Sequence, residues 1–416
     1  MRAEILATGD EILTGALVDS NSAFLAEQLE LLGLEVARHH TVGDSLEEIV
    51  DVLTEMGRRA DLAVVTGGLG PTTDDLTARA AAEAAGVSLV LDKEALADIE
   101  RFFAERKREM TPSNRKQAMI PEGARVLRNK VGTAPGFALK IGRCWACFMP
   151  GVPGEMRTMF RDRVLAHIRE TFGRDLHPAV VRTVTTFGLP ESEVGERVAA
   201  VESLFKGVRL GLRARFPEIQ VKLYGRLGRQ QEEDDLDGAV AWVCSRLGHN
   251  LVSDQGLSLP EAVGRLLRQK GATVAVAESC TGGLIAHLLT NVAGSSDYLL
   301  GAVVAYANQV KTGVLKVDPD VIAARGAVSR QVVEQMAIGV RSLTGADYGV
   351  ATSGIAGPTG GSPEKPVGTV CIGLASARGV VSRRYRLFFG SRQAHKTIFA
   401  AVALNRLRLS LTGKGD

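Results

Sequence analysis

One short stretch of the sequence brings together residue types that could do chemistry. ESCTGG sets Ser279 beside Cys280 directly before two glycines. A hydroxyl or a thiol at such a turn could act as a nucleophile, with the amides of Thr281, Gly282 and Gly283 as an anion or oxyanion site. On geometry alone, a serine or threonine at this position is more often a helix N-cap.

Acidic side chains follow two apolar runs in the N-terminal half. TGGLGPTTDD is a Gly-rich turn that ends in two aspartates, and TGDEIL adds two more carboxylates. Backbone amides in such a turn can cradle phosphate, and carboxylates can hold a hard cation. The residues concerned are Gly67, Gly68, Gly70, Asp74, Asp75, Asp10 and Glu11.

A second interpretation of these acidic residues stays open. Thr72, three residues before Asp75, resembles a capping box, and acidic groups in a first helical turn interact favourably with the helix dipole. Either aspartate alone fits a cap as well as a metal ligand. Two acidic clusters after two strands favour a functional site.

Alternating strands and helices must position these residues. Strands are expected at 3–9 and 61–68, and helices at 20–33 and 72–86. Such β-α alternation predicts an α/β fold with a parallel sheet and helices on both faces. The later run 273–290 reads as a strand, a sharp turn and a helix, with Ser279 in the turn.

The chain length predicts more than one domain, because 416 residues exceed the size at which a single core usually keeps growing. We expect an α/β domain over 1–170 and a small α+β, KH-like connector over 175–252. A second α/β domain is expected over 256–416. The connector contains no catalytic cluster, so a spacer or dimerisation role is expected for it.

In the connector, strands are expected at 179–189 and, as a pair, within 208–227. Helices are expected at 191–205 and 232–248.

Composition excludes several classes of protein. The formal net charge is +3, with 45% hydrophobic and 23% charged residues, and no dense basic run suggests nucleic acid or a membrane surface as a partner. No apolar stretch is long enough to span a bilayer and no signal-peptide pattern opens the chain, so a cytoplasmic location is expected. The five cysteines are expected to be free thiols, with Cys144 and Cys147 in the core rather than on a metal.

The N-terminal motifs TGDEILTG, DSNS, TGGLGPTTDDLT, NKVGTAPGF and MPGVPGEM resemble the N-terminal domain of the CinA family of competence/damage-inducible proteins. That domain is similar to the molybdopterin-binding fold. The resemblance implies metal-dependent ADP-ribose pyrophosphatase activity, which gives AMP and ribose 5-phosphate. A divalent cation of undetermined identity would be held or served by Asp10, Glu11, Asp74 and Asp75, with Asp75 also counted as catalytic.

The same resemblance implies a ligand-lining set. Its members are Asn21, Gly67, Gly68, Gly70, Thr133 and Gly136.

The C-terminal motifs VAGSSDYLLGAVVAYANQVKTGVL, GAVS, TSGIAGPTGG, KPVGTV and FGSR resemble the C-terminal CinA domain, which also occurs alone as nicotinamide mononucleotide amidohydrolase. The resemblance implies deamidation of nicotinamide mononucleotide to nicotinic acid mononucleotide and ammonia, without a cofactor. By resemblance Ser279 is the nucleophile, and Cys280 is a small packed residue.

No histidine lies in these motifs, which argues against a Ser-His-Asp arrangement. Lys311 is the candidate base, because burial lowers the pKa of an amine; a surface lysine or a phosphate ligand is the alternative. Tyr306 is counted with Ser279 and Lys311 among the catalytic residues, as a polar group that could orient substrate, and Arg392 could bind the nucleotide phosphate. Further polar groups that could orient substrate are Ser295, Ser296, Thr352 and Ser353.

The sequence therefore predicts a bifunctional pyridine-nucleotide salvage enzyme. A homodimer is the family expectation, and neither membrane nor nucleic acid is an expected partner. Two alternatives remain: a molybdopterin-type ligand-binding protein and a non-enzymatic competence factor.

Overall fold

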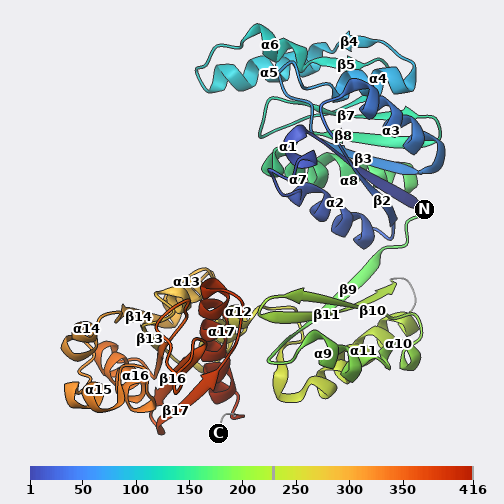
Figure 1. The fold of residues 1–416 in the computed structure, drawn as a ribbon. Coiled ribbons are helices and arrows are strands. Elements are labelled where there is room, and N and C mark those ends of the chain that lie inside the picture. The colour runs from blue at the N-terminus through green and yellow to red at the C-terminus, as the bar shows by residue number, and fades with distance from the viewer. Residues whose placement is uncertain (227–229, 415–416) are drawn as a thin grey trace. The chain divides into compact units, whose positions relative to one another are not determined.

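The computed structural model describes residues 1–226 and 230–414. It divides into two compact units, Met1–Val180 and Val181–Asp416 (Figure 1). Leu227, expected to end a connector strand, and residues 415–416 of the third expected domain lie outside the described residues. No helix within the described ranges is both long and apolar enough to cross a membrane. The division into three domains stays a prediction.

A six-stranded sheet forms the centre of the first unit, in the order β2-β1-β3-β8-β7-β6. The first four strands in this order run parallel, as expected, whereas β7 pairs antiparallel with β8 and β6 pairs antiparallel with β7. A two-residue turn joins β7 to β8, and so short a connection permits only antiparallel pairing. The bounds are β1 Arg2–Thr8, β2 Glu35–Val42, β3 Leu62–Thr66, β6 Arg125–Leu127, β7 Gly136–Ile141 and β8 Cys144–Met149.

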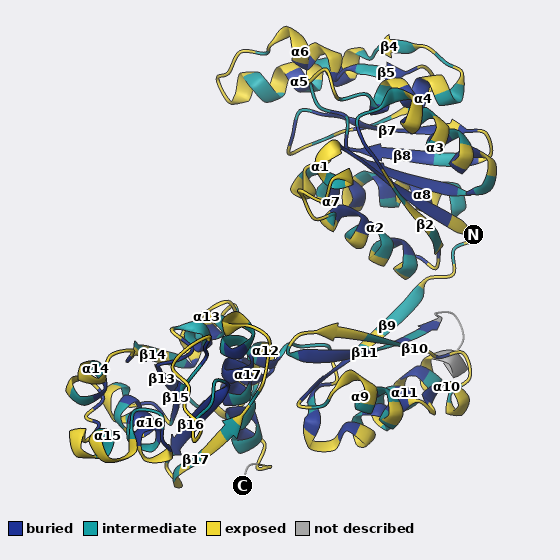
Figure 2. Cartoon of the chain, in the orientation of Figure 1, coloured by how far each residue is buried: buried dark blue, intermediate teal, exposed yellow. Residues whose placement is uncertain are grey.

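Helices cover both faces of this sheet, and each face has its own core (Figure 2). Because successive strand residues point to opposite faces, Ile5 joins one core and Leu6 the other. Cys144 and Cys147 are buried in β8, where burial raises the pKa of each thiol to about 12. The remaining elements are α1 Asp10–Leu13, α2 Ser20–Leu31, α3 Leu46–Arg59, α4 Thr77–Ala85, β4 Leu89–Leu91, α5 Lys93–Glu105, α6 Pro112–Lys116, β5 Met119–Pro121, α7 Pro153–Met159, a π-helical turn at Phe160–Val164 and α8 Leu165–Phe172.

Local signals account for the helix ends that position the N-terminal loops. Asp19 caps α2 by accepting a hydrogen bond from the Ser22 amide. Gly86 ends α4 in the left-handed conformation, with φ of 70°. The start of α4 differs from the expected residue 72, because residues 72–75 form a separate turn and the helix begins at Thr77.

The second unit begins with a four-stranded sheet in the order β10-β11-β9-β12. The helix expected over 191–205 is split in two at Ala199–Ala200. The bounds are β9 Ala179–Phe187, α9 Glu191–Val198, α10 Val201–Leu204, β10 Arg209–Arg215, β11 Glu218–Arg226, α11 Gln230–Leu247, a 3₁₀ turn at Gly248–Asn250 and β12 Leu251–Ser253.

A five-stranded sheet in the order β14-β13-β15-β16-β17 completes the second unit. Strand β13 pairs in parallel with β14 and β15, and β16 and β17 extend the sheet antiparallel. The bounds are α12 Leu259–Lys270, β13 Val274–Glu278, α13 Leu284–Thr290, a 3₁₀ turn at Ser295–Asp297, β14 Leu299–Val304, α14 Asn308–Gly313, α15 Pro319–Arg325, α16 Arg330–Thr344, β15 Tyr348–Gly354, β16 Thr369–Ser376, β17 Gly379–Arg386 and α17 Arg392–Leu411.

Two buried charged side chains join the connector to helices α12 and α17 of the second unit. Arg408 on α17 donates to the carbonyl oxygens of Leu251 and His249, at 2.6 and 2.7 Å. Glu218 on β11 accepts a hydrogen bond from the amide of Leu259, at the start of α12. Charge-assisted hydrogen bonds of this kind are stronger than neutral ones, so they fix the connector to these two helices.

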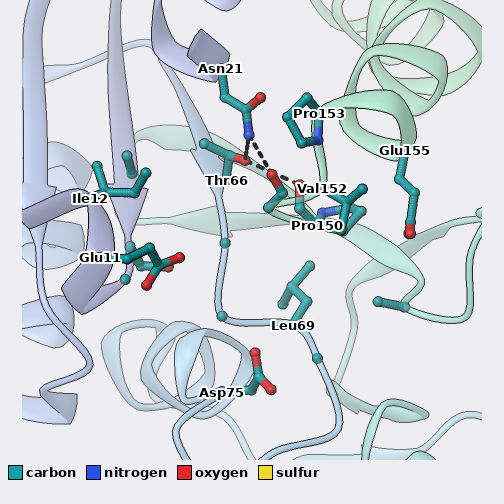
Figure 3. Close-up of a pocket in the computed structure, with 18 of the residues that line it drawn as sticks. Glu11, Ile12, Asn21, Thr66, Leu69, Asp75, Pro150, Val152, Pro153 and Glu155 are labelled. Atoms are coloured by element: carbon teal, nitrogen blue, oxygen red, sulfur yellow. Dashed lines mark hydrogen bonds between the residues drawn. The ribbon is translucent and has the colours of Figure 1, made fainter. Parts of the chain in front are cut away.

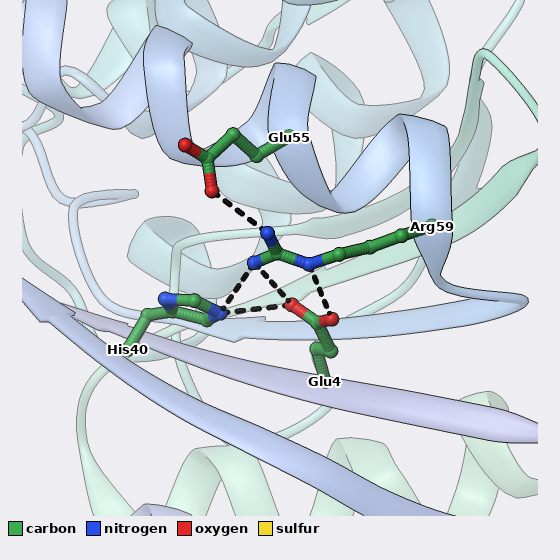
Figure 4. Close-up of polar contacts among 4 residues, drawn as sticks. All are labelled: Glu4, His40, Glu55 and Arg59. Atoms are coloured by element: carbon green, nitrogen blue, oxygen red, sulfur yellow. Dashed lines mark hydrogen bonds and ion pairs between the residues drawn. The ribbon is translucent and has the colours of Figure 1, made fainter.

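In the first unit, a charged cluster joins β1, β2 and α3 (Figure 4). Glu4, only 2% exposed, accepts hydrogen bonds from Arg59 Nε at 2.7 Å and contacts His40 Nε2 at 2.8 Å. Arg59 also donates to the exposed Glu55. Burial alone would raise the pKa of Glu4, but the hydrogen bonds from Arg59 and His40 outweigh it and lower the pKa.

We expect Glu4→Gln to lower the free energy of unfolding of the first unit by about 2–3 kcal/mol at neutral pH, because it removes the buried charge that pairs with Arg59. The folded-state pKa of Glu4 is below the unfolded value, so its contribution is complete above the unfolded pKa and is lost as pH falls through the folded one. Urea unfolding followed by Trp145 fluorescence in a Trp242→Phe background measures both effects.

Glu55→Gln is the matched control, because it removes a carboxylate that is mostly solvated and binds the same arginine. Its cost should stay below about 0.5 kcal/mol. Equal losses for the two variants would contradict the anchoring role of Glu4.

Candidate functional sites

A cleft of about 480 Å³ lies at the C-terminal ends of β1, β3 and β8 (Figure 3). The loops that follow these strands form its walls. Since parallel strands end at the same edge of a sheet, loops far apart in sequence meet there. The lining includes eight residues expected from the sequence: Glu11, Asn21, Gly67, Gly68, Gly70, Asp74, Asp75 and Thr133.

Two expected residues lie away from this lining. Asp10 turns toward the loop after β2, where its Oδ1 accepts a hydrogen bond from the Asp44 amide at 3.1 Å. Gly136 is buried inside β7, where a side chain would collide with Met159 and with the carbonyl oxygen of Phe148. Close packing between β7 and β8 accounts for this glycine.

Asp44 is a cleft residue that the sequence reasoning missed. It lies two residues after β2 and lines the cleft. Burial raises its pKa, and the nearby negative charges of Asp10, Glu11 and Asp74 raise it further. The sequence EVARHHTV of β2 has too few apolar residues to predict a strand. Asp44 was therefore not predicted as an acidic residue at a strand end.

Glycines make room for the cleft carboxylates. A methyl group on Gly70 would lie 2.5 Å from Asp75 Oδ2, and one on Gly9 would lie 2.9 Å from a carboxylate oxygen of Glu11. A methyl group on Gly132 would likewise collide with the carboxylate of Glu155. Glu155 is a further cleft residue that the sequence reasoning missed. Any side chain at these positions would displace an acidic group.

Asp75 is fixed by its own loop. Its Oδ2 accepts hydrogen bonds from the amide and hydroxyl of Thr72, at 2.8 and 2.6 Å. Lys116 donates to the carbonyl oxygens of Thr72 and Asp75 and so holds the turn from outside. Because α4 begins only at Thr77, the Thr72–Asp75 pair organises a turn rather than capping the helix.

Asn21 ties two cleft loops together. Its Nδ2 donates to the Gly151 carbonyl at 2.7 Å and to Thr66 Oγ1 at 3.2 Å (Figure 3). Thr66 in turn donates to the Pro150 carbonyl. These bonds join the end of β3 to the loop after β8, and they assign Asn21 a structural task in addition to its place in the lining.

No three histidine, cysteine or acidic side chains within the described residues lie close enough together to hold a metal ion by themselves. The carboxylates of Asp10 and Asp75 are also partly occupied by hydrogen bonds. A cation at this cleft would therefore need ligands from elsewhere.

The second candidate site forms around the turn after β13. Ser279 is held at the strand end, because its amide donates to the Thr352 carbonyl at 3.0 Å. Gly282 and Gly283 follow with φ of 60° and 89°, a conformation that favours glycine. The turn leads directly into α13.

Lys311 lies against Ser279, as the proposed pairing of nucleophile and base requires. Its Nζ is 3.3 Å from Ser279 Oγ and donates to the carbonyl oxygens of Ala305 and Tyr306, at 2.7 and 3.1 Å. The side chain is only 1% exposed, which excludes the alternative of a surface lysine. Burial lowers the pKa of this amine.

Glu278 is a site residue that the sequence reasoning missed. It is fully buried, and its carboxylate accepts the amides of Ile285 and Ala286, at 3.1 and 2.9 Å. These amides belong to the first turn of α13, where helical N–H groups have no partner within the helix. Glu278 therefore fixes the C-terminal end of the turn that carries Ser279, where α13 begins.

One of the three expected anion-binding amides is already in use. The Gly282 amide donates to the Ser279 carbonyl at 3.1 Å. Within the described part of the chain, the amides of Thr281 and Gly283 have no backbone or side-chain acceptor. Those two remain available for an oxyanion.

Cys280 is buried behind the turn, and burial raises the pKa of its thiol to about 12. A thiol with this pKa is protonated at neutral pH and makes a weak nucleophile. The observation favours the packed role expected for this residue.

Four further residues expected at this site, Arg392, Tyr306, Thr352 and Ser353, make hydrogen bonds through their side chains. The Arg392 guanidinium donates to the Tyr306 hydroxyl at 3.2 Å and to the Gly357 carbonyl at 2.5 Å. The Thr352 hydroxyl shares a hydrogen bond with that of Thr281. The Ser353 hydroxyl is turned to the Ala327 carbonyl.

Ser295 and Ser296 are not brought to Ser279 within the chain. They precede β14, whose first residue, Leu299, pairs with Val274 at the start of β13. Ser279 follows the opposite end of β13. Because the two strands are parallel, the two serines lie at the N-terminal ends of the strands, whereas Ser279 lies at their C-terminal ends.

Comparisons with known proteins agree with both motif sets. Residues 4–170 match the model described as "Probable molybdopterin binding domain", and residues 257–411 match "CinA C-terminal domain". A "CinA-like protein" of Desulfosudis oleivorans is 52% identical over 412 residues, 99% of this chain and 100% of that protein. Its counterpart in Geobacter sulfurreducens is 44% identical over 414 residues, 99% of each chain.

A solved structure, described as the protein CinA with unknown function from Thermoplasma acidophilum, is 36% identical, with a TM-score of 0.37. It covers 40% of this chain and 96% of its own. The family matches confirm the resemblances carried by the sequence motifs and the α/β fold class.

We expect Glu278→Gln to lower the free energy of unfolding of the second unit by about 2 kcal/mol, because a glutamine nitrogen would face a helical N–H group that needs an acceptor. Urea unfolding followed by Trp242 fluorescence in a Trp145→Phe background measures it. Glu261→Gln is the control, since glutamine also serves in the capping box that Glu261 forms with Ser258, and its cost should stay within about 0.5 kcal/mol. A Glu278→Gln protein as stable as the control would contradict this stabilising role of the Glu278 carboxylate.

Proposed function

Since the chain belongs to the CinA family, we propose that it is a bifunctional pyridine-nucleotide hydrolase. Its N-terminal cleft hydrolyses ADP-ribose to AMP and ribose 5-phosphate. Its C-terminal site deamidates nicotinamide mononucleotide to nicotinic acid mononucleotide and ammonia. The contact between Lys311 Nζ and Ser279 Oγ carries the proposal, because it pairs a hydroxyl with an amine whose pKa is lowered by burial.

In the deamidation, neutral Lys311 takes the proton of the Ser279 hydroxyl as Oγ bonds to the amide carbon of the substrate. The carbonyl oxygen becomes an oxyanion, for which the amides of Thr281 and Gly283 are the available donors. Lys311 then returns the proton to the amide nitrogen, the C–N bond breaks and ammonia leaves. Water, deprotonated by Lys311, attacks the acyl carbon and releases the acid, while Ser279 recovers its proton.

The surroundings of Lys311 support its role as a base. Its Nζ contacts two carbonyl oxygens and the serine hydroxyl, and no carboxylate partner of Lys311 occurs among the described residues. A carboxylate would favour the charged ammonium, whereas desolvation favours the neutral amine that can accept a proton.

In the N-terminal cleft, a divalent cation would neutralise phosphate oxygens and activate water. Mg²⁺ is commonly held by one or two carboxylates together with substrate phosphates rather than by a protein cage. The cleft carboxylates fit such a cation, because several lie near one another without forming a three-ligand cluster. One or two of Glu11, Asp74 and Asp75 would hold it together with the substrate phosphates. Amides of the turn after Gly67, whose own amide donates to the Met149 carbonyl, would bind the diphosphate.

A molybdopterin-type binding role is the second candidate for the cleft, because residues 4–170 match a molybdopterin-binding model. Product analysis separates the two, since binding alone yields no AMP. A non-enzymatic competence factor would show neither reaction. The proposal also includes a homodimer in the cytoplasm.

We expect Ser279→Ala to abolish ammonia release from nicotinamide mononucleotide, because no acyl intermediate can form without Oγ. Lys311→Met should lower kcat by about 10²–10⁴-fold with little change in KM. In the unchanged protein, kcat/KM should rise with pH and level off below the ordinary lysine pKa, because burial lowers the pKa of Lys311. Coupled ammonia assays from pH 6 to pH 11 measure these effects.

Cys280→Ala is the matched neighbour and should keep most of the ammonia release, because it removes a packed thiol. ADP-ribose hydrolysis should survive all three substitutions. A dead Cys280→Ala protein with an active Ser279→Ala protein would reverse the assignment of the nucleophile.

For the cleft, we expect Asp75→Asn to lower ADP-ribose turnover by about 100-fold or more, because it weakens the hold on the cation. Gly70→Ala should act in the same direction, since its methyl group would push the Asp75 carboxylate aside. Gly154→Ala is the control glycine, with open space around it and no positive φ. The measurement is AMP formation with and without added Mg²⁺ or Mn²⁺. If the Asp75→Asn protein kept full activity and only its melting temperature fell, Asp75 would have a structural role in the turn and no role in holding the cation.

A further inference from the structure

The turn between β10 and β11 places an aromatic side chain of the connector against the loop 387–391, which lies between β17 and α17. Arg215 pairs with Glu218 in this hairpin, so the turn has only two residues, and Phe216 is the first of them. The Phe216 ring lies 5.2 Å from the ring of Phe389, centre to centre, with 61° between their planes. Aromatic pairs prefer such edge-to-face geometry. An aromatic contact therefore joins the connector to this loop.

The hairpin that carries Phe216 is anchored to the rest of the second unit. Glu218, two residues after Phe216, is buried, and its carboxylate accepts a hydrogen bond from the amide of Leu259 at 2.5 Å. That amide lies at the start of α12, where helical N–H groups have no partner within the helix. Phe216 itself is 51% exposed, so the anchored hairpin holds its ring in place and a surrounding core does not.

Phe389 is connected to a buried histidine. Its backbone amide donates to His395 Nε2 at 3.1 Å, and His395 is only 4% exposed. A backbone amide can only donate, so Nε2 is the acceptor nitrogen and the ring proton lies on Nδ1. Nδ1 then donates to the Ala356 carbonyl at 3.0 Å. The imidazole therefore joins the loop 387–391 to the loop that follows β15.

The same two loops hold Arg392, the first residue of α17. Its guanidinium donates to the Gly357 carbonyl in the loop after β15 and to the Tyr306 hydroxyl. The contact between Lys311 and Ser279 is made from other elements, namely α14 and the turn after β13. Loss of the aromatic contact should therefore displace the guanidinium and leave the reacting pair in place.

We propose that Phe216 is a positioning residue for the deamidase site, which makes the connector a part of that site. By packing on Phe389 it holds the loop 387–391, and His395 passes this constraint to the loop after β15. The inference rests on the proposed deamidase function, in which Arg392 contacts the nucleotide between these loops. It gives the connector a task other than that of a spacer between two independent domains.

Two other roles for the aromatic pair make different predictions. A docking surface for a second protein would leave the kinetics of the isolated protein unchanged when Phe216 is replaced. A contact that only stabilises the fold would lower the free energy of unfolding without a change in KM. Kinetic measurements on the isolated protein therefore separate the positioning role from both.

The test measures ammonia release from nicotinamide mononucleotide by the full-length protein. We expect Phe216→Ala to raise KM about five- to tenfold with kcat nearly unchanged, because the ring contact that keeps Arg392 in place is lost. Phe216→Tyr should restore KM, since tyrosine keeps the ring. Leu204→Ala on α10 is the matched control, because Leu204 is an apolar connector residue of similar exposure, 56%. Unchanged kinetics, a loss confined to kcat, or an equal effect of Leu204→Ala would overturn the proposal.

A double-mutant cycle tests whether the effect passes through Phe389. Phe389→Ala should raise KM at least as much as Phe216→Ala does. The variant that carries both substitutions should be no worse than Phe389→Ala alone, because the effects of residues in contact are not additive. Increases in KM that multiply in the double variant would show that the two rings act independently, which contradicts the proposed route.

Hydrogen exchange keeps this proposal separable from the deamidase function. The Phe389 amide is bonded to His395 Nε2 and should exchange slowly in the unchanged protein. We expect faster exchange across 387–391 in Phe216→Ala and no change there in Leu204→Ala. If the unchanged protein releases no ammonia, the deamidase proposal fails and hydrogen exchange alone decides on Phe216. Identical exchange in the unchanged and Phe216→Ala proteins would overturn the positioning role.

Discussion

Parallel pairing of the central strands is the constraint on which both candidate sites depend. Parallel strands end at one edge, so the segments that follow them are brought together whatever their distance in sequence. In the second unit, β13 and β14 end beside each other, and this places Ser279 next to the carbonyl of Ala305, which accepts from Lys311. In the first unit, the ends of β1, β2 and β3 gather carboxylates from three loops.

Hydrogen bonds to the backbone then convert this proximity into defined geometry. The Ser279 turn is fixed at its start by the Thr352 carbonyl and at its end by the Glu278 carboxylate. The acidic turn of the cleft is fixed in a similar way, with Thr72 holding Asp75 from within and Lys116 holding it from outside. Each site rests on buried or charge-assisted bonds, which tolerate the loss of one partner poorly.

Much of this organisation could be predicted from the sequence, because strongly periodic segments and glycine turns are local signals. Helix α2 and the strand–turn–helix around Ser279 were foreseen, as was the pairing of Ser279 with Lys311. Asp44 was missed because β2 carries little apolar pattern, and Glu278 because a buried carboxylate looks like any residue at a strand end. The displaced positions of Ser295 and Ser296 follow from strand direction, which no local pattern encodes.

The two sites differ in electrostatic character, and this difference limits what each can bind. Clustered carboxylates in the cleft repel an anion, so a diphosphate can approach them only with a cation that neutralises both. Around Ser279, by contrast, the buried carboxylate of Glu278 is engaged by the Ile285 and Ala286 amides, and the Arg392 guanidinium supplies positive charge beside the Tyr306 hydroxyl. Under the proposed function, an anionic nucleotide would enter this second site without a metal ion. No carboxylate among the described residues pairs with Lys311, and burial lowers the pKa of this amine, which favours the neutral form that a general base requires.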